Sequence, residues 1–344
     1  MSNELISKGK RALKFLISPA LERPKSARLI ITIDCPFRCQ SCTFWYHPKW
    51  KQNRPNPSLE VIKHWIKEMA DFGIEEIDLG GGEPFVRPDL MEIVKEIKAR
   101  GMKCGLTTNG WLIGKVPFPP LDFCEVSIDG AKPETNDKIR GIKGAWEQAV
   151  KAVKIIKEHC PVKINFVIQA DNYLEMVDYC HLAKKLGVFA TFIPISLDLA
   201  AQPHLPDNLN KYDIPALKRQ IAESLKTGVV LNSPQFLWNF VKKLEGKEPS
   251  PQRCMAPFRV IMIWADNNVY PCGNFDRPVG NLSLGKSFKE IYKNYADTRK
   301  EVWRGGHKFC ESCVYGDVAN RRTILSSVFP YLKRNLFKKQ KNQK

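Results

Sequence analysis

The chain has 344 residues, of which 43% are hydrophobic and 26% are charged, and this balance excludes an intrinsically disordered or collagen-like protein. Its 54 Lys and Arg residues outnumber its 36 Asp and Glu residues, so the net charge is +18, which favours an anionic partner such as nucleic acid, a membrane surface or a phosphorylated substrate. No apolar run of about 18 residues and no signal-peptide pattern is present, so we expect a cytoplasmic protein.

The predicted elements begin after a basic amphipathic segment, residues 1–26. From there, short apolar runs alternate with segments of helical period, which is typical of successive βα units. The expected strands are residues 27–34, 75–80, 102–108, 124–129, 162–169 and 188–194, and the expected helices are residues 58–71, 89–100, 145–158, 173–186, 213–225 and 234–244. This order predicts a parallel sheet covered by helices, either a partial β/α barrel or a doubly wound sheet. In both architectures ligands bind at the C-terminal ends of the strands.

A group of three cysteines, Cys35, Cys39 and Cys42, directly follows the first expected strand. In a chain without a secretory signal, clustered cysteines indicate metal binding or catalysis rather than disulfides. A structural zinc site closes with four ligands, and no CxxC or HxxxH pair lies near these three cysteines in the sequence to complete it. Three thiolates instead fit an iron-sulfur cluster in which one iron stays open for another ligand.

A second group of cysteines lies in the last third of the chain. Its members are Cys254, Cys272, Cys310 and Cys313. Four sulfur ligands fit structural zinc and an iron-sulfur cluster about equally well. The remaining cysteines of the predicted strands and helices are expected to be ordinary buried side chains: Cys104, Cys124, Cys160 and Cys180.

Short motifs follow the other expected strands in register: GGGEP at 80–84, TTNG at 107–110 and VSIDG at 126–130. Together with CxxxCxxC at 35–42, they resemble the radical S-adenosylmethionine (SAM) superfamily over residues 27 to about 195. Residues 254–316 resemble the SPASM or twitch region of such enzymes. The resemblance implies an α/β fold, a partial (β/α)6 TIM-type barrel followed by a small cysteine-rich α+β module.

The resemblance also implies roles for individual residues. Cys35, Cys39 and Cys42 would hold a [4Fe-4S] cluster whose open iron binds SAM. The residues implied in SAM binding are Ser41, Gly81, Gly82, Glu83, Ser127 and Arg140. Glu83 would accept a hydrogen bond from the SAM ammonium group. Ser41 departs from the commonest pattern, which has an aromatic residue near the adenine.

The resemblance further implies a second, auxiliary [4Fe-4S] cluster, ligated by the four cysteines of the second group, that relays an electron. The expected reaction is reductive cleavage of SAM to a 5'-deoxyadenosyl radical, which abstracts a hydrogen atom from an unidentified substrate. Oxidation or bond formation on a peptide, small molecule or lipid-linked substrate would follow. A low-potential donor such as ferredoxin or flavodoxin would supply the electron.

We divide the chain into the segment 1–26, a radical SAM core at 27–230, an auxiliary-cluster region at 231–320 and a basic amphipathic tail at 321–344. The basic ends have three interpretations, namely a solvated tail, an amphipathic helix on a membrane surface and an RNA contact. Interleaved basic and apolar residues in the tail favour peripheral contact with the anionic inner face of a membrane over binding to nucleic acid. Two alternatives are a non-catalytic iron-sulfur scaffold protein and a zinc-containing RNA-binding protein.

Overall fold

The sheet is the framework of the protein. The computed structural model describes residues 23–46, 55–195, 211–247, 254, 256–273, 275 and 277–304. Within this part of the chain nine strands form one sheet, in the order β6-β5-β4-β3-β2-β1-β7-β8-β9. The parallel strands are β1 (Ser26–Thr32), β2 (Glu76–Gly81), β3 (Lys103–Thr108), β4 (Phe123–Ser127), β5 (Val162–Ile168), β6 (Phe189–Pro194) and β7 (Val260–Ile263).

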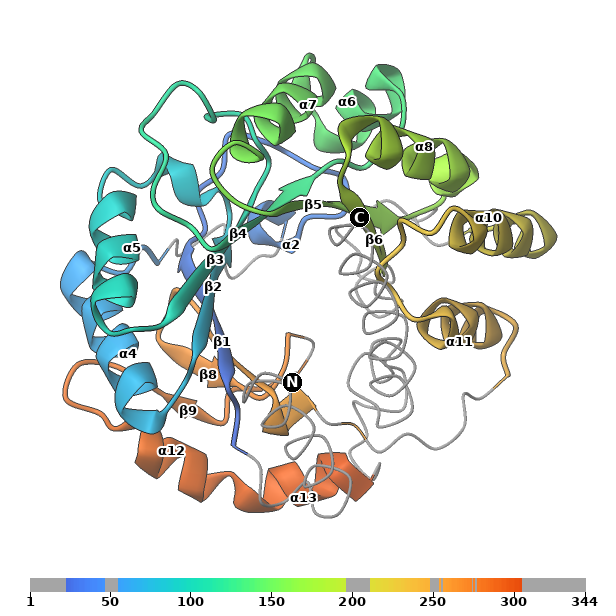
Figure 1. Ribbon diagram of the computed structural model, residues 1–344. Helices are drawn as coiled ribbons and strands as arrows, with labels where there is room; N and C mark the ends of the chain where they lie inside the picture. Colours follow the sequence, from blue (N-terminus) through green and yellow to red (C-terminus); the bar gives the residue numbers. More distant parts are fainter. Residues whose placement is uncertain are drawn as a thin grey trace, which may run out of the picture.

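The first six strands follow one another in chain order, and helices cover the outside of the curved sheet (Figure 1). The outer helices are α4 (Leu59–Phe72), α5 (Leu90–Ala99), α6 (Pro133–Arg140), α7 (Ala145–Ile156), α8 (Met176–Leu186), α10 (Ile214–Lys226) and α11 (Pro234–Leu244). Consecutive strand order is that of a barrel, whereas a doubly wound sheet reverses its order near the middle. The predicted partial barrel is therefore confirmed.

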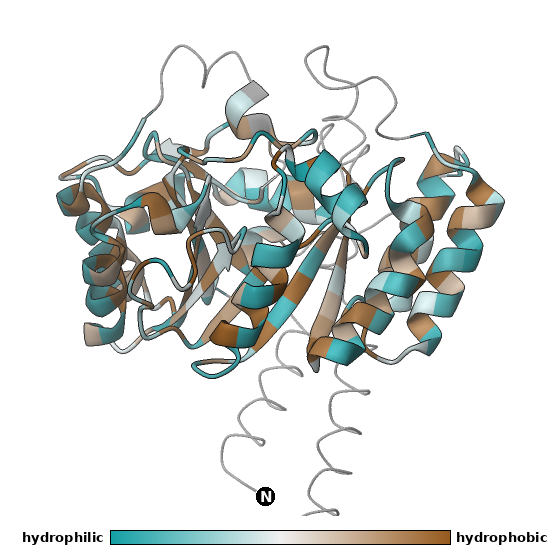
Figure 2. Ribbon diagram, turned by 90° about the horizontal axis from the view of Figure 1, so that it is seen from above, coloured by the Kyte–Doolittle hydropathy of each residue, from teal (hydrophilic) through white to brown (hydrophobic). Residues whose placement is uncertain are grey.

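Helix α4 illustrates how the sequence sets an element. The Ser58 side chain accepts a hydrogen bond from the Val61 N–H at the start of the helix, and Gly73 ends the helix in the left-handed region with φ 93°. Apolar residues at helical spacing, such as Trp65 and Met69, are fully buried against the sheet. Hydrophilic and hydrophobic residues alternate along the outer helices in Figure 2, so the core lies between the sheet and the helix layer.

The C-terminal strands extend the same sheet. β7 pairs in parallel with β1, and β8 (Asn268–Tyr270) and β9 (Gly280–Asn281) follow in antiparallel pairing. Helix α12 (Phe288–Asn294) packs on α4, where the Phe72 and Phe288 rings are 4.8 Å apart. The buried Trp65 indole donates a hydrogen bond to the Leu282 carbonyl at 2.9 Å. The region after residue 256 is thus joined to the barrel by both backbone and side-chain contacts. Helix α13 (Ala296–Arg304) ends the described part.

Three sequence predictions lie outside the described residues. They are the basic tail at 321–344, Cys310 and Cys313, and nearly all of the segment 1–26. Among the residues that the structure describes, none of the helices is both long and apolar enough to cross a membrane.

Candidate active site

The first cysteine group lies on the loop that follows β1, with all three thiols half-buried. Two contacts shape this loop, because the Gln40 N–H donates to the Ile139 carbonyl at 2.9 Å and the Trp45 indole donates to the Cys39 carbonyl at 3.0 Å. Burial raises the pKa of Cys35 to about 12 and that of Cys42 to about 11. Such thiols ionise when a metal binds, since metal ligation stabilises the thiolate.

In the described part of the chain, no three potential ligands are gathered around a point as they are for a single metal ion. In an iron-sulfur cluster each thiolate binds a different iron atom. The donor set of three thiols on one loop therefore fits an iron-sulfur cluster.

The GGGEP turn runs along the start of the cysteine loop. The Gly82 N–H donates to the Thr32 carbonyl and the Glu83 N–H donates to the Asp34 carbonyl, both at 2.8 Å. A Cβ atom on Gly82 would lie 2.1 Å from the Asp34 oxygen, and Gly81 has φ 129°. Only glycine permits this backbone contact, so the two glycines bring β2 against the cysteine loop.

Glu83 is fully buried within the turn. One carboxylate oxygen accepts hydrogen bonds from the Thr108 hydroxyl at 2.8 Å and the Phe85 N–H at 3.2 Å, and the other accepts from the Asn109 N–H at 2.7 Å. Burial raises the pKa of Glu83 to about 7, although these hydrogen bonds oppose the rise. The carboxyl is held rigidly and becomes easier to ionise when a cation lies beside it.

Asn109 connects this carboxyl to the cysteines. Its amide nitrogen Nδ2 is 3.6 Å from Cys35 Sγ, while its Oδ1 accepts a hydrogen bond from the Trp111 N–H at 2.9 Å. The TTNG motif therefore contacts Glu83 through the Thr108 hydroxyl and the Asn109 N–H, and Cys35 through the Asn109 side chain.

Arg140, at the C-terminal end of α6, reaches the cysteine loop from the other side. Its Nη2 forms an ion pair with Asp129 Oδ2 at 2.8 Å, and its Nη1 is 3.9 Å from Cys39 Sγ. The Nε atom is buried and has no hydrogen-bond partner. Burial raises the pKa of Asp129 against the opposing effect of Arg140. Of the three guanidinium nitrogens, Nε is thus the one that lacks a partner in the protein, and its N–H is left for an anionic acceptor.

Two further polar atoms are buried without a partner near the C-terminal end of β5, namely Asn165 Oδ1 and Gln169 Oε1. Ser127 is in register with Asn165 on the neighbouring strand, and Ser41 is half-buried on the cysteine loop. Because buried polar atoms are normally satisfied, these acceptors and Arg140 Nε suit a polar ligand with N–H, O–H and carboxylate groups. SAM has such groups, so these residues fit it.

Two residues of the sequence motifs, Asn109 and Asp129, make contacts that the sequence did not predict. Asn109 belongs to TTNG, and its contact with Cys35 depends on how the loops after β3 and β1 meet. Asp129 belongs to VSIDG, and its ion pair with Arg140 depends on the position of α6. A third residue, Arg87, holds the segment after GGGEP to the end of β1 through hydrogen bonds to the carbonyls of Ile31 and Pro57, both at 2.9 Å.

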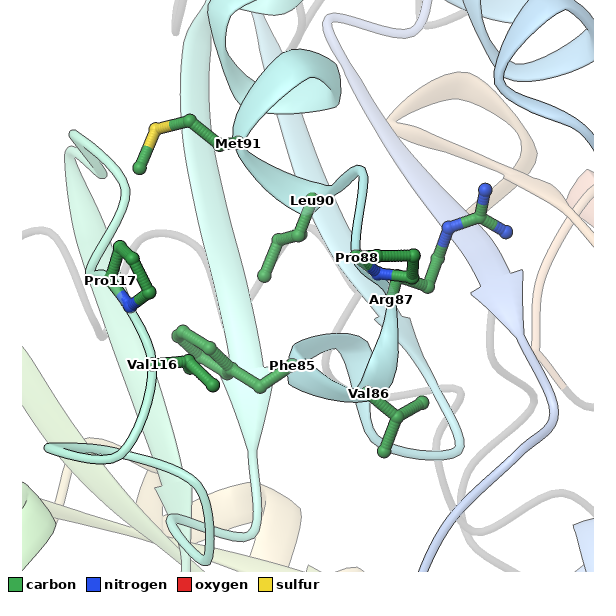
Figure 3. Close-up of a pocket in the computed structure, with 8 residues that line it drawn as sticks. All are labelled: Phe85, Val86, Arg87, Pro88, Leu90, Met91, Val116 and Pro117. Carbon is green, nitrogen blue, oxygen red and sulfur yellow. The ribbon is translucent and has the colours of Figure 1, made fainter.

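A separate hollow of about 300 Å³ lies on the outer side of the GGGEP segment. Apolar side chains such as Phe85, Leu90 and Val116 line it, and the Arg87 guanidinium points away from it (Figure 3). The cysteines do not line this hollow, so we do not assign it to the same site.

In the second cysteine group, the structure describes Cys254 and Cys272, which are both half-buried. Cys310 and Cys313 fall outside the described residues, so the predicted four-sulfur set stays a prediction.

Comparison with known proteins shows which proteins the chain is similar to. Residues 29–183 match the sequence model of the family described as the Radical SAM superfamily. This part of the chain is therefore similar to the radical SAM superfamily. The match spans the cysteine loop and the GGGEP, TTNG and VSIDG motifs, and homologues with named enzymatic activities support an enzyme whose reaction is unspecified.

Two named relatives match different lengths of this chain. It is 27% identical to "AdoMet-dependent heme synthase" from Methanosarcina barkeri over 82% of this chain and 86% of that protein. It is 31% identical to "Probable GTP 3',8-cyclase" from Thermococcus kodakarensis over 49% of this chain, which spans 56% of that protein. The similarity to the heme synthase thus continues beyond the barrel.

Solved structures show the same fold. Streptococcus suis SuiB has a TM-score of 0.62 at 14% identity, covering 86% of this chain and 73% of that chain. Native anSMEcpe with bound AdoMet has a TM-score of 0.61 at 16% identity, covering 93% of this chain and 100% of that chain. The radical SAM fold is therefore shared over most of the length.

Proposed function

We propose that this enzyme cleaves SAM reductively at a [4Fe-4S] cluster held by Cys35, Cys39 and Cys42, and that the resulting 5'-deoxyadenosyl radical abstracts a hydrogen atom from a substrate. The observation that carries the proposal is the contact of the GGGEP turn and the TTNG motif with the cysteine loop. When bound, the cluster supplies the single electron for this chemistry. The chain itself binds, orients and shields the reactants.

Three groups would position SAM. Glu83 has lone pairs left for an ammonium donor, whose positive charge would favour the ionised carboxylate. The unpartnered Arg140 Nε would donate to the SAM carboxylate. Ser127 and the buried Asn165 Oδ1 would contact hydroxyl groups of the ribose. Gly81 and Gly82 bring the turn close to the cysteine loop, and Ser41 would lie towards the adenine.

Iron and acid-labile sulfide per chain, measured after anaerobic reconstitution, test this proposal. The wild type should bind about eight iron atoms if both cysteine groups hold [4Fe-4S] clusters, and the variant Cys35→Ala, Cys39→Ala, Cys42→Ala about four. The variant should form no 5'-deoxyadenosine from SAM under strong reduction. Absence of iron from the wild-type protein would contradict the proposal.

The second cysteine group is proposed to hold an auxiliary [4Fe-4S] cluster through Cys254, Cys272, Cys310 and Cys313. The supporting observation is that Cys272 directly follows β8, which joins the same sheet as the first cysteine loop. Zinc bound in place of iron in the triple variant would contradict this assignment, and the SAM-cleaving site would stand. We also propose a ferredoxin or flavodoxin as the donor, tested by 5'-deoxyadenosine formation with each reduced protein.

A narrower candidate is a role in heme synthesis. It is favoured by the relatives named as AdoMet-dependent heme synthases, whose similarity covers 82% of this chain, whereas the match to the Thermococcus cyclase covers 49%. Expression in a strain that lacks its own heme synthase tests this candidate. Restored heme, lost again in the Cys35→Ala variant, would support it, and unrestored heme despite accumulated enzyme would count against it.

Peripheral membrane association is proposed from the charge of +18 and the basic amphipathic segments at the two ends of the sequence. Co-sedimentation with anionic liposomes at low salt tests it. Equal recovery with neutral and anionic liposomes would contradict it.

A further inference from the structure

The inner face of the sheet differs from the face that packs on the helices. Side chains alternate between the two faces, so Leu29 belongs to the main core while Arg28 and Ile30 face the inside of the barrel. Met262 on β7 is in register with Arg28 and lies on the same face. Tyr270 is directly opposite Met262 in the antiparallel pair β7–β8, which places it on the inner face as well.

A second apolar cluster, separate from the main core, occupies this inner face. Its members are the buried Ile30, Ile33 and Ala265 and the half-buried Phe44, Met262 and Trp264. The rings of Phe44 and Trp264 are 5.5 Å apart, and those of Trp264 and Tyr270 are 5.8 Å apart. We call these three aromatic residues, Phe44, Trp264 and Tyr270, the aromatic wall.

The aromatic wall extends from near Cys42 to near Cys272. Phe44 is two residues after Cys42, and Tyr270 is two residues before Cys272. The turn that follows Cys272 contacts the same cluster, since a Cβ atom on Gly273 would lie 3.1 Å from the Met262 sulfur. A molecule that lies between Cys42 and Cys272 therefore meets these rings.

The rest of the inner face carries charged side chains. Arg28 pairs with Asp78 at 3.3 Å and donates to the Thr107 hydroxyl at 3.1 Å, and Lys163 pairs with Glu125 at 2.5 Å. The cations are more exposed than the acids, at 35% for Arg28 and 32% for Lys163 against 20% for Asp78 and 15% for Glu125. Branched apolar residues usually fill the interior of a closed barrel, so this row of charges indicates a surface that meets polar groups.

We propose that the substrate has a flat apolar body that stacks on the aromatic wall and an anionic group that contacts Arg28 or Lys163. This inference rests on the proposed function, because it assumes that the radical reacts with a molecule on the inner face. Aromatic rings gain energy from a flat partner beyond the area that they bury. The half-buried state of the rings leaves them accessible to that partner.

Two fluorescent probes with the same aromatic body test the proposal, anilinonaphthalene sulfonate and the uncharged N-phenylnaphthylamine. Each is titrated into the full-length, anaerobically reconstituted enzyme. The wild type should bind the sulfonate more tightly. Trp264→Leu should weaken the binding of both probes about fivefold. Trp264→Phe should bind them with an affinity within about twofold of the wild type because it keeps a ring. Arg28→Gln should weaken the binding of the sulfonate and leave that of the uncharged probe unchanged.

Two control variants match these changes at other places. Trp146→Leu removes a half-buried indole from the outer helix α7, and Lys95→Gln removes an exposed cation from α5. Both should bind the probes as the wild type does. Equal weakening in Trp146→Leu and Trp264→Leu, or equal affinity of the wild type for the two probes, would overturn the inference.

Iron content and substrate-free formation of 5'-deoxyadenosine are measured in the same preparations. If the wild type forms 5'-deoxyadenosine but the probes do not distinguish Trp264→Leu from its control, the inference fails and the proposed function stands. If the wild type binds no iron and forms no 5'-deoxyadenosine, the proposed function itself fails.

Discussion

Arg140 and Asp129 form a buried ion pair of 2.8 Å whose guanidinium also lies 3.9 Å from the sulfur of Cys39. Asp129 is fixed in turn, because its Oδ1 accepts a hydrogen bond from the Val167 N–H at 2.7 Å. The aspartate therefore fixes the orientation of the guanidinium, which places Nη1 towards the cysteine loop and leaves Nε without a partner in the protein.

Replacing Asp129 with asparagine should leave the buried Arg140 charge uncompensated. We expect a loss of about 3 kcal/mol in the free energy of unfolding and weaker binding of SAM. Denaturant unfolding and SAM titration of the reconstituted enzyme measure both effects. Asp122→Asn, which removes a more exposed ion pair with Lys98, should cost about 1 kcal/mol or less. Similar values for the two variants would show that the buried pair has no special role.

Replacing Gly82 with alanine should separate the GGGEP turn from the cysteine loop, because the new Cβ atom would lie 2.1 Å from the Asp34 oxygen. We expect the variant to retain less iron at the first cysteine group and to bind SAM poorly, as measured by iron analysis and titration. Gly101→Ala is the control, since its left-handed backbone with φ 74° has no atom within 4 Å of a new Cβ. It should lose about 1 kcal/mol of stability and keep its iron.

Glu83 should make the stability of the iron-free chain depend on pH. Its pKa of about 7 in the folded chain lies above the ordinary value of 4.5, so the folded state holds the proton more tightly than the unfolded state does. The free energy of unfolding should therefore fall as pH rises from about 4.5 to 7, by about 3 kcal/mol in total from this group. Urea unfolding across this range measures the slope. Glu83→Gln should flatten it, and an unchanged slope would refute the assignment.

Asn109 should adjust the reduction potential of the cluster. Asn109→Asp keeps the acceptor for the Trp111 N–H but replaces the donor to Cys35 with a carboxylate. Hydrogen bonds to cluster sulfurs raise the potential, so we expect a lower potential in this variant. A redox titration followed by electron paramagnetic resonance measures it. Asn109→Leu serves as the uncharged comparison and should shift the potential in the same direction by less.

Much of the barrel could be predicted from local patterns. The alternation of apolar runs with helical segments predicts the parallel strands, and the position of each motif after a strand predicts which residues share one edge of the sheet. Helix α6 was not among the predicted helices, although Pro133 at its start and Gly141 after its end are typical signals. Its polar composition, PETNDKIR, gives little apolar period, and so the position of Arg140 was not predictable.

The aromatic wall shows a different limit of the sequence. Phe44 and Trp264 are 220 positions apart, and their contact depends on the pairing of β7 with β1, which no local pattern encodes. The buried ion pair of Arg140 with Asp129 has a different origin, because these residues are close in sequence and their contact depends on helix α6. Long-range strand pairing, rather than propensity, decides the contact of Phe44 with Trp264.

The position of β7 beside β1 has a consequence for synthesis of the chain. While the ribosome is still making residues up to 263, β1 has β2 on one side and an open row of backbone N–H and C=O groups on the other. An open strand edge invites pairing with other chains. The strand that carries the first cysteine loop is therefore enclosed late in translation, so a nascent chain halted before β7 would be prone to aggregate.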